Sequence, residues 1–341
     1  GIMGSIVALG LAAGQPLGGL LVGAMGWRAV FWVNVAVGLL AWVVVARCVP
    51  ESPPLESGQR FDAAGALLLF VCLTAYALGV TLGQQWGFER GEVWGLLGLS
   101  AVALIAFLRL EASLAQPMLD LSLFKDRIFG LNLIMAWLAF LLMGGTFTLP
   151  FILEVVLGYT PQQTGLMMMV VPVSMGITSP LAGNLADRLG SRVVSLAGLA
   201  VMTLGCLSLS TVDQQVGAWG YVLRVAPIGI GLGLFQTPNN SAIMGAAPRN
   251  RLGVASGLVA LSRTLGNTSG VPLMGAFFTG HVLAAASLPP HTDFLAAPPL
   301  ALIAGFRGTY HLASLLAVLG MALAVTAIIM ARRRLAEQPA E

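Results

Sequence analysis

Apolar residues fill long stretches of this 341-residue chain, and polar residues gather in short segments between them. A helix needs about 20 apolar residues to cross a bilayer, and in lipid it must form all its backbone hydrogen bonds internally. Strands of a membrane barrel would be short and alternating, and no stretch has that pattern. We therefore predict an all-α polytopic membrane protein with ten transmembrane helices, near residues 1–24, 29–47, 63–83, 92–109, 128–151, 164–186, 193–212, 217–236, 252–280 and 309–331.

The composition supports this interpretation, because only 9% of the residues are charged, against about 25% in a soluble domain. Lys and Arg concentrate in short cytoplasmic loops. With residue 1 on the cytoplasmic side, twelve of the 17 basic residues fall inside, Arg28, Arg90 and Arg307 fall outside, and Arg224 and Arg263 lie within spans. The net charge of +3 therefore belongs to the loops and gives no reason to expect nucleic acid as a partner.

The cysteines and histidines point to no chemistry. The three cysteines are far apart, so they predict neither a disulfide framework nor a metal site. The three histidines flank one outer segment without the spacing that places two imidazoles on one helix face. We therefore expect no metal, cofactor or catalytic residue, and no enzyme. The residues concerned are Cys48, Cys72, Cys206, His281, His291 and His311.

Two segments, 1–24 and 257–280, resemble each other. Seven of their 24 aligned positions are identical, and five of these seven are glycine or proline. Glycine in a helix interior costs about 1 kcal/mol and proline about 3 kcal/mol relative to alanine. Helix-breaking residues at the same positions in both segments therefore need a structural reason. As the first and ninth spans, both segments cross the membrane in the same direction. This indicates a parallel repeat, as in transporters built from two similar halves.

The repeat also predicts how the chain is divided. Its second copy is the fifth span of a closing group of six, so the first copy should also be a fifth span, with four more spans before it in a complete protein. We therefore expect a fragment of a fourteen-span protein. Its parts would be two helices of an N-terminal bundle (1–50), a linker and central helix pair (51–127), a C-terminal six-helix bundle (128–332) and a cytoplasmic tail (333–341).

These features resemble the fourteen-span drug:proton antiporter branch of the major facilitator superfamily, whose fold would then have about ten of fourteen helices present here. The fifth-span motif of that branch has the form G-x8-G-x3-G-P-x2-G-G, which the chain follows from Gly1 with its proline displaced by one residue. The segment GWRAVFWVNVAVGLL resembles the start of the sixth span. The motif and helix-interface residues are Gly10, Gly14, Pro16, Gly18 and Gly19, with Gly266, Gly270 and Pro272 in the second copy.

The glycine spacing has a physical meaning of its own. Gly10, Gly14 and Gly18 recur every four residues and form a smooth stripe on which a neighbouring helix can approach closely. Pro16 frees a backbone carbonyl and bends the helix. Such a helix suits a moving interface between two halves or static packing of the GxxxG kind. The repeated breakers favour the moving interface.

A second motif, GNLADRLGSR at 183–192, joins the second and third spans of the closing six. It is similar to the superfamily's signature at that place, and the resemblance implies a cytoplasmic latch that holds the two halves in one state. Asp187 stands at a helix end, where a carboxylate can meet backbone N–H groups or arginine. A simple charge anchor is the alternative. The latch residues are Gly183, Asp187, Arg188, Gly190 and Arg192.

Polar residues within spans mark candidate substrate or proton paths. Arg263 lies in SRTLGNTSG, an unusually polar segment that favours a face toward water or substrate, although its side chain could instead reach the cytoplasmic interface. Glu154 lies near the outer end of its span, where an ordinary interfacial role is the alternative. The segment FQTPNN is expected to close the eighth span at the inner mouth. The candidates are Arg263, Arg224, Glu154, Gln236 and Asn239.

The resemblance implies efflux of drugs or other lipophilic small molecules in exchange for protons, by alternating access, in a bacterial inner membrane. Two alternatives stay open: a truncated membrane protein without transport, and a membrane enzyme of lipid metabolism. Against the enzyme, the sequence has no cytoplasmic cluster of aspartates or histidines that would bind Mg²⁺ and pyrophosphate.

Overall fold

The computed structural model describes residues 25–49, 62–114, 117–289 and 292–337, together with Gly10, Gly14, Leu17, Gly18 and Leu21. Within these residues nine helical segments are long and apolar enough to cross a membrane. They match nine of the ten predicted spans, and the span predicted at 1–24 lies almost wholly outside the described residues. The spans are Arg28–Cys48, Ala63–Gln84, Gly91–Ser113, Arg127–Val156, Pro161–Leu189, Ser191–Leu209, Ala218–Ala246, Leu252–Ala286 and Pro299–Arg333.

Two of these spans are composite. The fourth joins an α-helix to a 3-10 turn, a short α-helical turn and a π-turn, and the fifth joins two α-helices. The α-helices are α2 (Arg28–Cys48), α3 (Ala63–Trp86), α4 (Gly91–Ser113), α5 (Arg127–Met143), α6 (Leu149–Phe151), α7 (Pro161–Met168), α8 (Val170–Leu189), α9 (Ser191–Leu209), α10 (Ala218–Ala246), α11 (Leu252–Ala286) and α12 (Pro299–Glu337). The short elements are η1 (Leu121–Lys125), η2 (Gly144–Thr148), η3 (Ile152–Val156), η4 (Arg249–Arg251) and η5 (Phe294–Ala296).

Polar side chains fix where several helices begin. The Asp62 carboxylate accepts a hydrogen bond from the Gly65 N–H at 2.9 Å at the start of α3, and Asp126 accepts one from the Ile128 N–H at 2.9 Å at the start of α5. Thr160 and Gln163 form a reciprocal capping box at α7. Such caps satisfy N–H groups that have no partner within the helix.

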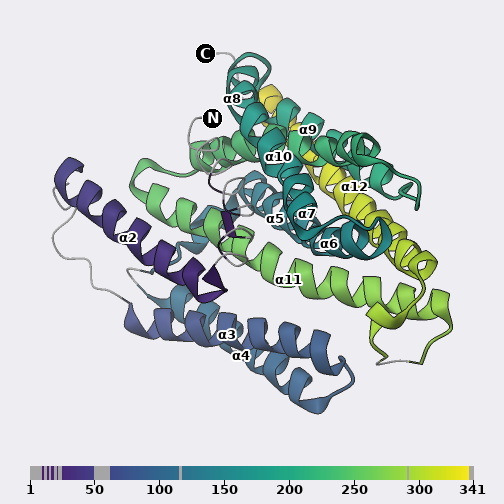
Figure 1. The fold of residues 1–341 in the computed structure, drawn as a ribbon. Helices are drawn as coiled ribbons and strands as arrows, with labels where there is room; N and C mark the ends of the chain where they lie inside the picture. The colour runs from purple at the N-terminus through teal and green to yellow at the C-terminus, as the bar shows by residue number, and fades with distance from the viewer. Residues whose placement is uncertain are drawn as a thin grey trace.

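Helices α5 to α12 form one bundle with a continuous apolar core (Figure 1). Helix α10 packs against α8 and α9, and α12 packs against α9, α11 and α5. The largest fully buried side chains of this bundle are aromatic, and they include Tyr221, Phe235, Phe278, Phe306 and Tyr310.

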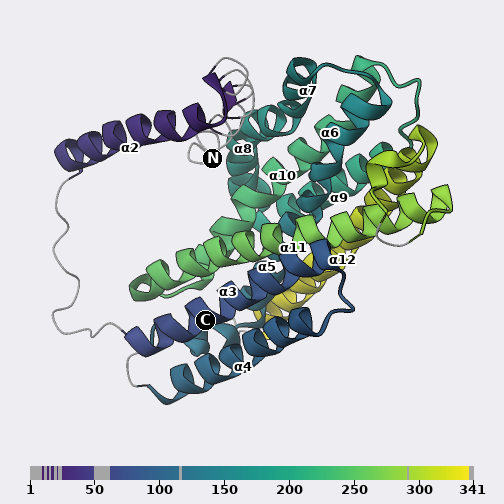
Figure 2. The same cartoon turned by 60° about the horizontal axis from the view of Figure 1, so that its bottom comes forward.

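The hairpin of α3 and α4 lies beside the bundle, with α3 against α11 (Figure 2). The Tyr76 hydroxyl of α3 lies 2.6 Å from the Ser269 hydroxyl of α11. Helix α2 stands away from the other helices in Figure 2, and Ala29 is its one buried residue among those described. Because α2 exposes large apolar side chains on all sides, lipid or another part of the protein must cover it.

Two predicted helix ends were wrong. The eighth span does not close at FQTPNN, since α10 continues to Ala246 and buries Gln236 and Asn239. The last span begins at Pro299, ten residues before the predicted start at 309. Proline is well suited to the first turn of a helix, and Arg307 stays within α12 because its Nε donates to the Val212 carbonyl at 3.0 Å.

Candidate functional site

The motif GNLADRLGSR forms the tight turn between α8 and α9. Gly183 and Asp187 lie in α8, and Gly190 separates the two helices. Gly190 has φ +87°, a left-handed conformation that glycine adopts without strain, and its N–H donates to the Ala186 carbonyl at 2.9 Å. The turn therefore requires the second glycine of the motif.

The charged residues of this turn are unpaired. Asp187, Arg188 and Arg192 are exposed, and none has an ion pair or side-chain hydrogen bond within the part of the chain that the structure describes. Asp187 lies in the last turn of α8, where the helix dipole is negative, so the expected contact with backbone N–H groups is not made.

A cavity of about 620 Å³ lies next to the turn, at the predicted cytoplasmic end of the bundle. The starts of α5 and α9 and the ends of α10 and α12 surround it. Arg192 from the motif and Arg332 from α12 line it together with Asp126. The motif therefore borders a space between helices whose mainly apolar lining carries three charged side chains.

Two glycines of the second repeat copy allow α11 to approach α5 closely. A Cβ atom on Gly266 would lie 2.7 Å from the Trp137 carbonyl oxygen and from the Phe140 Cβ, and one on Gly270 would overlap the Leu141 backbone. Both neighbours belong to the same six-helix bundle. These glycines therefore pack two helices of one bundle, and their role at an interface that moves stays a prediction.

Pro272 is buried in α11, two residues beyond this close approach. It has no N–H to donate to the Thr268 carbonyl, but α11 continues past it for fourteen residues, to Ala286. In the first copy, Cβ atoms on Gly10, Gly14 and Gly18 would meet no atom of the described residues within 4 Å. Pro16 and Gly19 lie outside the described residues.

The polar segment of α11 is divided between three environments. Thr264 and Asn267 are exposed and lie three residues apart on one face of α11. Ser269 faces α3 and contacts the Tyr76 hydroxyl. The Arg263 guanidinium lies 5.2 Å from the centroid of the Phe140 ring of α5, in the geometry of a cation–π contact. Arg263 is thus held against the bundle, and the exposed polar face lies next to it.

The other candidates are spread over the bundle. Arg224 donates through Nη1 to the Gly220 carbonyl at 2.9 Å and through Nε to the Thr211 hydroxyl at 3.3 Å. Glu154 is exposed in the π-turn η3, and π-turns occur often at functional sites. The structure does not bring these two residues together with Arg263, and their place in a substrate or proton path stays a prediction.

Gln236 and Asn239 are buried rather than placed at an inner mouth. The Asn239 amide donates through Nδ2 to the Asn132 backbone carbonyl of α5 at 3.1 Å. The Asn132 amide in turn donates to the Ile128 carbonyl at 2.9 Å. The bond joins α10 to α5, whereas the Asn239 Oδ1 is buried without a hydrogen-bond partner among the described residues. A place for Gln236 and Asn239 in a substrate or proton path stays a prediction.

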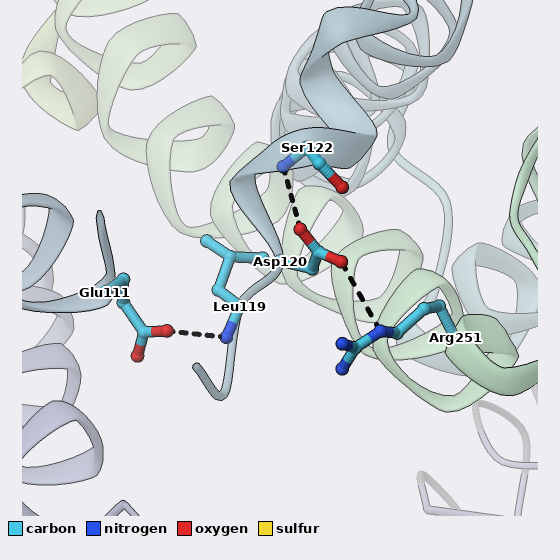
Figure 3. A network of polar contacts seen from close by, with 5 residues as sticks. All are labelled: Glu111, Leu119, Asp120, Ser122 and Arg251. Carbon is cyan, nitrogen blue, oxygen red and sulfur yellow. Dashed lines mark hydrogen bonds and ion pairs between the residues drawn. The ribbon is translucent and has the colours of Figure 1, made fainter. Parts of the chain in front are cut away.

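A polar network that the sequence did not indicate ties the hairpin to the bundle (Figure 3). Glu111 of α4, only 2% exposed, accepts from the Leu119 N–H at 2.8 Å. Asp120 accepts from the Ser122 N–H at 2.9 Å, and its other carboxylate oxygen lies 3.4 Å from Arg251 Nε. Hydrogen bonding with Ser122, and to a lesser degree the charge of Arg251, lowers the pKa of Asp120.

Comparison with known proteins decides the family. The model of the Major Facilitator Superfamily matches residues 1–271 and 148–340. The chain belongs to this superfamily. The predicted resemblance to the superfamily is thereby confirmed, as is a multi-pass membrane protein with helical spans. The fourteen-span branch and the missing helices stay predictions.

Individual relatives are named after transport or resistance. The chain is 35% identical to the multidrug resistance protein Stp of Mycobacterium tuberculosis over 86% of the chain and 54% of Stp. It is 28% identical to the multidrug transporter protein MdtP of Bacillus subtilis over 90% of the chain and 58% of MdtP. It is 28% identical to the riboflavin transporter RibZ of Clostridioides difficile over 95% of the chain and 69% of RibZ. The chain thus spans roughly half to two thirds of the length of these relatives.

Proposed function

We propose that the complete protein exports drugs or other lipophilic small molecules across a bacterial inner membrane, in exchange for protons. Superfamily membership and the names of Stp and MdtP support this function. The name of RibZ shows that relatives of similar identity handle other solutes, so the substrate must be tested directly.

The observation that carries the proposal is the asymmetry of α11. One face packs its glycines against α5, whereas another exposes Thr264 and Asn267 next to Arg263. The Thr264 hydroxyl donates to the Ala260 carbonyl at 3.0 Å, but the Asn267 amide makes no hydrogen bond within the described residues. In a membrane such an exposed amide is costly unless water, a substrate or another helix meets it. We assign this polar face to the path between the two halves of the transporter, where alternating access would expose it to each side in turn.

The turn of GNLADRLGSR is the second part of the proposed mechanism. Asp187 has no partner in the described part of the chain and therefore has a charge available for the other half. A contact made in only one of two states would shift the balance between them without touching the substrate. No cofactor or covalent chemistry is needed.

The test is substrate efflux from cells or vesicles that contain the complete protein. Asn267→Leu and Thr264→Leu should reduce efflux of a fluorescent lipophilic cation at unchanged protein level. Thr326→Leu is the matched control, because Thr326 is also an exposed threonine but lies on α12. Dissipating the proton gradient should stop efflux by the unaltered protein. Normal efflux by both α11 variants would overturn the assignment of this face, and efflux that ignores the gradient would overturn proton exchange.

A further inference from the structure

A second cavity, of about 920 Å³, opens at the opposite end of the bundle from the motif turn. It lies between α11, α12 and the loop that joins α9 to α10. Arg307, His281 and His311 line it together with apolar residues of α12. The sequence pattern placed His281 and His311 on either side of one outer segment but did not predict that they share a cavity with Arg307.

The Arg307 guanidinium is held in one orientation, but no carboxylate pairs with its charge within the described residues. Its Nε donates to the Val212 backbone carbonyl at 3.0 Å, which fixes the guanidinium plane at the cavity wall. Its two terminal nitrogens have no partner within the described ranges. A guanidinium held in this way can present two parallel N–H donors to a phosphate or carboxylate.

His281 is also held in place. Its Nδ1 lies 3.0 Å from the Phe277 carbonyl oxygen, and its ring lies against the α12 backbone at Gly308, where a Cβ atom would come within 2.8 Å of the ring. Its Nε2, like the ring of His311, has no hydrogen-bond partner in the part of the chain described. Two imidazoles and a guanidinium thus have free polar groups at one cavity.

Asp213 is the carboxylate among the lining residues of this cavity. Its Oδ1 accepts from the Gln215 N–H of the same loop at 3.0 Å, so that oxygen is satisfied locally. The charges of Arg307 and Asp213 offset each other in sum, so an anion would be held by the hydrogen-bond donors of Arg307 and the two imidazoles rather than by a net positive charge.

The depth of the cavity relates it to the membrane surface. A hydrocarbon core of about 30 Å corresponds to about 20 helical residues, and this count from Arg332 outward along α12 ends near Leu312. Arg307 and His311 then lie at the level of the lipid headgroups. Leu315 lines the same cavity one turn deeper and is 66% exposed.

We propose that this cavity binds an anionic phospholipid of the outer leaflet, with its phosphate on Arg307 and the two histidines and an acyl chain along Leu315. The combination of a cationic group at headgroup level and an exposed apolar strip directly below it fits an amphiphile better than a free anion. The inference does not rest on the proposed transport function.

The experiment is native mass spectrometry of the purified protein reconstituted with phosphatidylcholine and increasing phosphatidylglycerol. The unaltered protein should retain phosphatidylglycerol in preference to phosphatidylcholine. Arg307→Gln should weaken this retention about tenfold, the effect expected for losing hydrogen bonds to a charged group. His311→Leu should weaken the retention less and should leave the fold intact, because the ring makes no hydrogen bond within the described residues. Arg90→Gln is the matched control, an outer-side arginine that contacts Trp86 away from the cavity.

The possible results distinguish a bound phospholipid from a bound free anion. Retention that survives an excess of inorganic phosphate and falls in Arg307→Gln but not in Arg90→Gln supports the lipid. Displacement by inorganic phosphate would show a site for a free anion and overturn the lipid assignment. Equal retention by the unaltered protein and both cavity variants would overturn the site itself.

Discussion

Gly144 and Gly270 meet backbone to backbone where η2 crosses α11, so closely that a Cβ atom on Gly144 would overlap the Gly270 main chain. The contact joins the first and fifth membrane segments of the bundle without any side chain between them. In lipid, where no hydrophobic force drives helices together, such close approach is a main source of association energy.

The first prediction concerns Gly270, which packs against Leu141 as well as against Gly144. Gly270→Ala should lower the stability of the folded protein by about 1–3 kcal/mol, because the methyl group would overlap the Leu141 backbone, although alanine favours a helix. Thermal unfolding in detergent measures the change. Gly280→Ala is the control, because a Cβ atom on Gly280 of the same helix would meet no described atom within 4 Å, and it should be neutral or stabilising. An equal effect of the two substitutions would refute the close packing.

Leucine at Gly270 separates packing from motion. If the glycine serves only packing within the bundle, Gly270→Leu should abolish folded protein. If α5 and α11 shift during transport, a Gly270→Leu variant that still accumulates should fail to export. Cysteines introduced along the transport path should then react with a thiol reagent from one membrane face only. A leucine variant that accumulates and transports normally would contradict both roles.

The second prediction concerns the unpaired carboxylate of the α8–α9 turn. Asp187→Asn should leave expression and substrate binding unchanged, because Asp187 contacts no described partner, but should slow efflux by shifting the balance of states. Glu92→Gln, an exposed carboxylate at the start of α4, is the control. Unchanged turnover at a normal protein level would reduce the motif to a charge anchor.

The third prediction concerns pH. The pKa of Asp120 is lowered in the folded protein, so its stabilising contribution is present above its ordinary value of 3.8 and is lost as pH falls through the lower folded value. Asp120→Asn should therefore lower the melting temperature slightly at neutral pH and have no effect in strong acid. The loss should be small, since exposed ion pairs contribute about 0.2–1 kcal/mol. A variant whose deficit grows with acidity would contradict this sign.

The fourth prediction concerns the docking of the hairpin. Tyr76→Phe removes the hydroxyl that lies 2.6 Å from Ser269 and should cost about 1 kcal/mol. Tyr159→Phe is a suitable control, because that hydroxyl has no hydrogen-bond partner in the described structure. Hydrogen exchange along α3 would locate the effect. Protection that is unchanged in α3 would show that the hairpin docks without this bond.

The sequence predicted the spans well because their signal is local: a run of apolar residues needs lipid whatever its neighbours are. It failed where a polar residue stays in a helix by finding a distant partner. Asn239 looked like a helix end, but its amide donates to Asn132, 107 residues away. Arg307 looked like a loop residue, but it donates to Val212 from within α12.

In the candidate site, too, local features could be predicted from the sequence and distant contacts could not. The turn at Gly190 could be predicted, because a single left-handed glycine between two helices is a local feature. The partner of Gly270 could not, since nothing near Gly144 in the sequence marks it as the other half of a contact. Pairing of small residues between helices depends on how the bundle assembles, which one sequence does not reveal.

The fastening of the α3–α4 hairpin has a practical consequence for measuring motion. Arg251 holds it through Asp120 at one end, Ser269 through Tyr76 farther along, and the Gln84 side chain would meet a Cβ atom on Gly275 beyond that. One hydrogen bond and the packing of α3 along α11 hold the hairpin against the bundle, and the ion pair anchors the segment that follows the hairpin. A fluorophore or spin label on the exposed side of α4 would therefore report how far, and in which direction, the whole C-terminal body tilts.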